Sequence, residues 1–123
     1  MKVELKTIKI TKSIIEQSQM ASFEEMTSFD VLGWIMVKRK SGWQKMILFY
    51  NAISHKLVWI YSPQNSSDIR IEPRTTEIYH VNMDCGNGFC LTTRGLDYDK
   101  AKELQSNLVQ TLDTANSKGQ IYY

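Results

Sequence analysis

Hydrophobic positions in the middle of the chain alternate in the way that predicts a three-stranded antiparallel meander. The runs VLGWIMVKRK and WQKMILFY are joined by a Ser-Gly pair, and KLVWIYS follows the turn NAISH. On the middle strand, Trp43, Ile47 and Phe49 fall on one face, whereas Met46 and Leu48 fall on the other. We therefore expect short helices to cover one face, and a second layer, a strongly curled sheet or a partner subunit to cover the other.

The end of the chain has the pattern of an amphipathic helix. After Gly95, one helical stripe is formed by Ala101, Leu104, Leu108, Leu112 and Ala115. Asp97 and Asp99 suit the first turn, and Gly119 stands where a helix ends. The tail GQIYY either dangles or adds a last edge strand, and the sequence leaves both open.

The start of the chain predicts a strand followed by short helical segments. Residues 3–10 alternate with a bulge in the middle. Ser13 and Glu16 have the spacing of a capping box, with Thr11 as an alternative cap, and a second helical turn is expected before Phe29.

Short strands are expected at 68–72 and 76–83, followed by a hairpin whose register has two alternatives. A two-residue Asn-Gly turn would place Cys85 opposite Cys90, close enough for a disulfide or a paired-thiol site. A three-residue loop with Gly88 left-handed would instead pair Cys85 with Phe89.

We favour the three-residue loop because it separates apolar from polar positions more cleanly. Its inner face would hold Tyr79, Val81, Met83, Cys85, Phe89 and Leu91. Its outer face would hold His80, Asn82, Asp84, Cys90, Thr92 and Arg94. Both cysteines are then unpaired thiols.

These elements predict one α+β domain over residues 1–123. It should contain an antiparallel sheet of five to seven strands, a short N-terminal helix and a longer C-terminal helix.

Composition agrees with one ordinary globular domain. Of 123 residues, 42% are hydrophobic and 23% are charged, and the net charge of +2 is too small to imply a nucleic-acid or membrane partner by itself. The chain begins without the apolar core of a signal peptide, and its hydrophobic runs are far shorter than a membrane span. We expect a cytoplasmic protein, in a bacterium or in a host's cytosol.

Catalytic and metal-binding signatures are absent from the sequence. It has no nucleophile elbow, no phosphate-binding glycine loop and no carboxylate pair at diagnostic spacing. Two cysteines at the wrong spacing and two histidines, His55 and His80, make a metal site improbable. We therefore expect a non-enzymatic protein without a cofactor.

Two regions remain candidates for binding. The polar hairpin face formed by His80, Asn82, Asp84, Thr92 and Arg94 would suit a small-molecule sponge or a small enzyme centred on His80 and Arg94. The basic hairpin end consists of Lys38, Arg39, Lys40 and Lys45 with Trp43, and it would suit a nucleic acid or an acidic protein.

Tyr61, Tyr122 and Tyr123 lie at a strand end or in the tail, so we expect them, like Trp43, to contact a partner. The runs GW, FY and IYSP, followed by GNGF and a helix, resemble the ArdB/KlcA plasmid antirestriction proteins over about half the chain. The Asn-Gly-Gly-Phe-Tyr segment of those proteins is missing here. Our leading hypothesis is a protein that docks on another protein, as phage or plasmid inhibitors and toxin-immunity proteins do. We also expect a homodimer.

Overall fold

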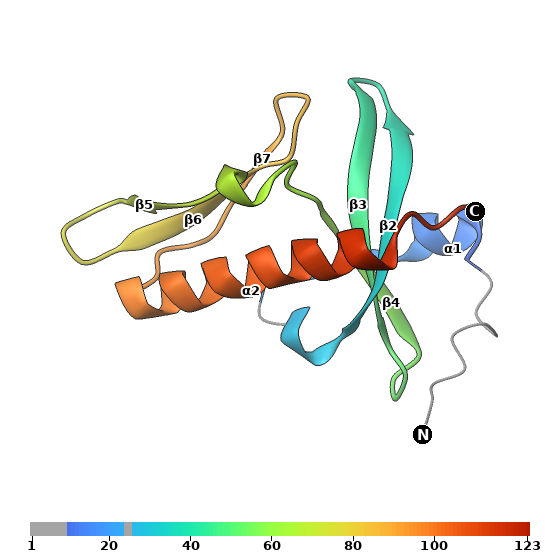
Figure 1. Ribbon diagram of the computed structural model, residues 1–123, viewed down its shortest axis with the longest axis horizontal. Helices are drawn as coiled ribbons and strands as arrows, with labels where there is room; N and C mark the ends of the chain where they lie inside the picture. Colours follow the sequence, from blue (N-terminus) through green and yellow to red (C-terminus); the bar gives the residue numbers. More distant parts are fainter. Residues whose placement is uncertain (1–9, 24–25) are drawn as a thin grey trace.

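Two small sheets and one long helix make up most of the fold (Figure 1). The computed structural model describes residues 10–23 and 26–123. The first sheet contains β1 (Gln19–Met20), β2 (Asp30–Arg39), β3 (Gly42–Asn51) and β4 (Lys56–Tyr61). The second contains β5 (Ile69–Pro73), β6 (Tyr79–Asp84) and β7 (Cys90–Thr92). The remaining elements are α1 (Lys12–Gln17), α2 (Tyr98–Lys118) and the 3-10 turns η2 (Met26–Ser28) and η3 (Ser66–Asp68). Apart from Ile10, the strand expected at residues 3–10 lies outside the described residues.

The α+β class is confirmed, but the single sheet of five to seven strands is wrong. The strands form a four-stranded sheet in the order β1-β4-β3-β2 and a three-stranded sheet in the order β5-β6-β7. The outer edge of β4 is occupied by β1, which pairs with it in parallel, and the Ala21 N–H then donates to the Trp59 carbonyl at 2.8 Å. Within the described residues, β5 pairs with β6 and with no strand of the first sheet.

The central meander is confirmed. Antiparallel pairing places Trp34 opposite Ile47 and Lys38 opposite Trp43, with a bulge between Val31 and Gly33. The pairing of β3 with β4 then covers only the later part of β3, from Met46 onward. Consequently the first residues of β3 keep a free edge on the β4 side.

The three-residue hairpin loop is also confirmed. The Cys85 N–H donates to the Phe89 carbonyl, and the Phe89 N–H donates to the Gly86 carbonyl, both at 2.8 Å. Gly88 has a φ of +73°, and Met83 lies opposite Leu91. Phe89 was expected inside, which is wrong: its ring is 39% exposed.

The predicted helices are present with adjusted ends. Thr11, rather than Ser13, caps α1, because its hydroxyl accepts a hydrogen bond from the Ile14 N–H. The carboxylate of Asp97 caps α2 by accepting from the Lys100 N–H at 2.8 Å, and α2 ends at Gly119, whose φ is +91°. Four residues of the predicted stripe are buried: Ala101, Leu108, Leu112 and Ala115.

Both faces of the first sheet are covered by the chain itself. On one face, Ile47 and Phe49 belong to a core shared with α2 and the second sheet. On the other, Met46 and Leu48 pack in a cluster that includes Ile15 of α1. The cluster also contains the fully buried Ile35 and six partly buried residues: Ile10, Leu32, Val37, Trp59, Tyr61 and Ile121. The face for which a curled sheet or a partner subunit was considered is therefore covered by a short helix and the two ends of the described chain.

The C-terminal tail adds a short edge pairing to β2. The Trp34 N–H donates to the Gly119 carbonyl at 3.1 Å, and the Ile121 N–H donates to the Trp34 carbonyl at 2.7 Å. The Tyr123 hydroxyl donates to the Met36 carbonyl at 2.9 Å. Among the helices in the described part of the chain, none combines the length and apolar character needed to cross a membrane.

Candidate partner-binding surface

The end of the β2–β3 hairpin brings together most of the residues that the sequence singled out for partner binding. We call this region the tip surface. It consists of Lys38, Arg39, Lys40, Trp43, Tyr61 and Phe89. Five of these six residues were predicted to bind a partner. Phe89 was not, because alternation along its strand placed it on the inner face of its hairpin.

One side of the tip surface presents a cation against an exposed indole. Lys38 and Trp43 are opposite each other in the hairpin, and the Lys38 Nζ lies 5.5 Å from the centroid of the Trp43 ring. Trp43 is 56% exposed, although indole rings usually bury most of their surface. The pair is therefore a large apolar group kept at the surface beside a positive charge.

The other side is a row of side chains in contact, whose rings are tilted or edge-to-face. The Arg39 guanidinium lies 6.0 Å from the centroid of the Tyr61 ring, and one of its nitrogens is 3.5 Å from the Tyr61 hydroxyl. The Tyr61 ring contacts Phe89, with centroids 4.4 Å apart, and Trp59 at 4.9 Å. Tyr61 is consequently half-buried and supports Arg39 and Phe89, which are exposed.

Lys45 was predicted to belong to this basic hairpin end, but it is directed elsewhere. Its Nζ donates to Asn116 Oδ1 at 2.7 Å and lies 4.6 Å from the centroid of the Trp34 ring. Burial lowers the pKa of Lys45 below its ordinary value of 10.5. Lys45 therefore joins the sheet to α2, and the tip surface carries the charges of Lys38, Arg39 and Lys40.

The two terminal tyrosines flank β2. Tyr123 is 49% exposed, and its hydrogen bond to Met36 places it along the strand two residues before Lys38. Tyr122 is 82% exposed. Both side chains remain accessible for contact with a partner.

The second sheet holds the tip surface in place. Asn87, in the loop of the β6–β7 hairpin, donates from Nδ2 to the Trp43 carbonyl at 2.6 Å. The buried amide of Gln44 donates to the Cys85 carbonyl, and the Ser62 N–H donates to the Lys45 carbonyl at 2.9 Å. The bonds from Asn87 and Ser62 reach carbonyls of β3 before the start of its pairing with β4, and the Gln44 bond ties the same strand to Cys85.

Three of the polar residues proposed as a ligand face, His80, Asn82 and Asp84, form hydrogen bonds within the fold. His80 Nδ1 is 2.7 Å from the Thr93 carbonyl, so it donates there. Asn82 donates to the Glu72 carboxylate at 2.6 Å, while its own Oδ1 is buried and has no partner. The Asp84 carboxylate accepts from the Gly86 N–H at 2.9 Å, and Thr92 is exposed.

Arg94 lies beyond the two strands that carry the other residues of that face. It follows the end of β7, where alternation stops, and it lines a cleft beside α2 together with Phe23 and Leu104. The small enzyme or sponge centred on His80 and Arg94 therefore stays a prediction.

The two cysteines lie on opposite faces of their hairpin. Cys85 is buried and Cys90 is exposed, and both are free thiols. Burial, reinforced by the nearby negative charges of Asp84 and Cys90, raises the pKa of Cys85 to about 12. No group of three or more metal-ligating side chains occurs within residues 10–23 and 26–123.

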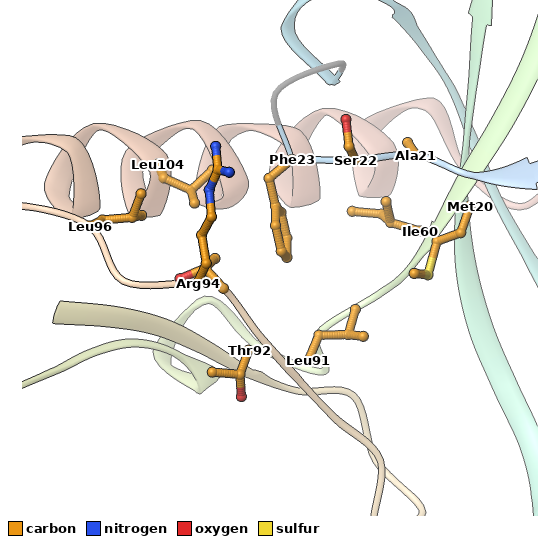
Figure 2. Close-up of a pocket in the computed structure, with 11 residues that line it drawn as sticks. Met20, Ala21, Ser22, Phe23, Ile60, Leu91, Thr92, Arg94, Leu96 and Leu104 are labelled. Carbon is orange, nitrogen blue, oxygen red and sulfur yellow. The ribbon is translucent and has the colours of Figure 1, made fainter. Parts of the chain in front are cut away.

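The cleft beside α2 is a feature that sequence reasoning missed (Figure 2). Its walls come from the segment that includes β1, from β4, from β7 with the residues after it, and from α2. Its lining includes Met20, Phe23, Ile60, Leu91, Arg94 and Leu104. These residues are scattered over the chain, and only the packing of two sheets against one helix brings them together.

Comparison with protein-family models, with curated proteins and with solved structures found no match. The resemblance to plasmid antirestriction proteins gains no support from these comparisons.

Proposed function

We propose that this chain is a non-enzymatic protein that docks through its tip surface onto an acidic patch of a partner protein. The observation that carries the proposal is the Trp43 ring, 56% exposed and lying against Lys38 at the end of a hairpin. Tryptophan, tyrosine and arginine are the residues that most often dominate binding energy at protein interfaces. Trp43, Tyr61 and Arg39 supply all three.

The charges select the kind of partner. Lys38, Arg39 and Lys40 are exposed neighbours at the hairpin end. Positive charge at the rim of an interface steers association toward negative patches and disfavours basic ones. The aromatic groups then provide the area that is removed from water on docking.

The support of the hairpin end reduces the entropic cost of binding. Asn87 and Gln44 tie the strand that carries Trp43 to the second sheet. A surface that is already ordered loses less conformational freedom on association. Such a docking surface, without catalytic motifs in the sequence, suits a phage or plasmid inhibitor or a toxin-immunity protein, and we place the chain in that class.

A second candidate function is nucleic-acid binding, which the pairing of Lys38 with Trp43 favours. An exposed indole can stack on a base while adjacent lysines contact phosphates. The modest net charge of +2 gives less support to this function than to protein docking.

Affinity capture from the native host with matched variants tests the proposal. We expect Trp43→Ala and the double variant Lys38→Glu, Lys40→Glu each to lose the captured protein. Tyr98→Ala is the control, because Tyr98 is 48% exposed but lies on α2. Equal capture by Trp43→Ala and the wild type would contradict docking through the tip surface.

A parallel titration separates the second candidate. Short single- and double-stranded oligonucleotides are added at two salt concentrations, and binding is followed by fluorescence anisotropy. Tight binding that weakens steeply with salt and is lost in Trp43→Ala would favour nucleic acid. We expect no such binding.

A further inference from the structure

The cleft beside α2 arises because two sheets rest on one helix without packing face to face. Its volume is about 370 Å³, which is within the range of small-molecule sites. In Figure 2, the Phe23 side chain points from the segment after β1 into the space between α2 and β7. Ile60 and Leu91 face the same space from β4 and β7.

Apolar groups dominate the inner part of this cleft. Met20, Ala21, Phe23, Ile60, Leu91, Leu96 and Leu104 line it. Phe23, Leu91, Leu96 and Leu104 are only partly buried, so the chain leaves part of this apolar surface uncovered. A ligand that fills the cleft would remove that surface from water.

Arg94 supplies a positive charge at the wall of the cleft. Figure 2 shows its side chain running from the end of β7 toward α2, beside Phe23 and Leu104. Arg94 already contacts another part of the chain. A guanidinium has five N–H donors, so it can keep one contact and still bind a carboxylate.

The adjoining hollow contributes balanced charges. It shares Phe23, Arg94 and Leu104 with the cleft and is further lined by Lys100 and Glu103. Of the charged residues described in the lining of the cleft and the hollow, Arg94 and Lys100 are cationic and Glu103 is anionic.

We propose that this cleft binds an amphiphilic anion, namely an unbranched alkyl chain of roughly eight to twelve carbons that ends in a carboxylate. The chain would lie against Phe23, Leu91 and Leu104, and the carboxylate would accept hydrogen bonds from Arg94. This site is separate from the tip surface, so its failure would leave the docking proposal intact.

Binding of octanoate, decanoate and decanol to the wild-type protein tests the inference by titration calorimetry. Each added methylene should strengthen binding roughly fourfold. Replacing the carboxylate of decanoate with the hydroxyl of decanol should weaken binding at least tenfold. No binding of decanoate at roughly 1 mM, or equal binding of decanoate and decanol, would overturn the proposal.

Variants and chemical-shift mapping locate the site. Arg94→Gln should weaken decanoate at least tenfold and leave decanol unchanged, whereas Arg74→Gln, on the exposed turn between β5 and β6, should change neither. Methyl signals of Leu91, Leu96 and Leu104 should shift on adding decanoate. If decanoate changed the chemical shifts only of residues outside the cleft, the proposed site would be rejected, even if Arg94→Gln failed to fold.

Discussion

The Nζ atom of Lys45 lies 4.6 Å from the centroid of the Trp34 ring and 2.7 Å from Asn116 Oδ1. Lys45 therefore connects β3 with β2 and α2, although its neighbours along the hairpin point their charges into solvent. We therefore expect Lys45 to contribute to stability, and Lys38, Arg39 and Lys40 to contribute to docking.

Replacing Lys45 with Ala should lower the free energy of unfolding by about 1 kcal/mol, because a cation–π contact and a hydrogen bond are both lost. Lys38→Ala should change it by less than about 0.5 kcal/mol, since Lys38 is exposed. Urea denaturation measures both. In partner capture, Lys38→Ala should have the larger effect and Lys45→Ala the smaller one. A larger loss of capture by Lys45→Ala would contradict the assignment of Lys45 to stability.

The two thiols should differ sharply in reactivity. At pH 8 a disulfide reagent should modify Cys90 rapidly, whereas Cys85 is buried and its pKa is raised to about 12, so it should react only after denaturation. The measurement is the number of fast-reacting thiols, which we expect to be one in the wild type and none in Cys90→Ala. Two fast thiols in the folded protein would show that Cys85 is accessible.

The raised pKa of Cys85 also predicts a pH dependence of stability. The folded state holds the thiol proton more tightly than the unfolded state, whose thiol has the ordinary pKa of 9.0. The stability linked to this proton is therefore fully present below pH 9 and is lost as the pH rises toward 12. Between pH 8 and 10, the wild type should lose more stability than Cys85→Ala. Identical losses in the two proteins would contradict the shift.

Gly33 and Gly88 should respond differently to substitution by alanine. Both have positive φ, at +145° and +73°. A Cβ atom at Gly33 would stand 2.6 Å from the Gly119 carbonyl oxygen, whereas one at Gly88 would meet no atom within 4 Å. Gly88→Ala should cost about 1 kcal/mol in backbone strain, and Gly33→Ala should cost at least about 2 kcal/mol because the tail must also move. Equal costs by urea denaturation would show that the tail pairing adds no constraint.

Local patterns in the sequence were sufficient for several parts of the fold. The three-residue loop before Phe89, the meander and the helix that ends at Gly119 all follow from side-chain alternation, helical spacing and glycine at positive φ. These features depend on residues that are close in sequence, so the information that specifies them is contained within each segment.

The tip surface was predicted only in part. Lys38, Trp43 and Tyr61 were identified as partner-binding residues, because exposed charge and aromatic groups at strand ends are visible in the sequence. The positions of Lys45 and Phe89 were not predicted, since each is fixed by a neighbour from a distant part of the chain: Asn116 for the first and Tyr61 for the second.

The sequence by itself predicted the meander, the later short strands and the two α-helices, together with most of their apolar faces, but it did not predict β1. Tertiary structure decided that the strands divide into two sheets, that α1 and the tail cover the second face of β3, and that Arg94 lines a cleft beside α2. The reason is that alternation and helical spacing are local, whereas the pairing of β1 with β4 and of β5 with β6 is a choice among segments that no local pattern specifies.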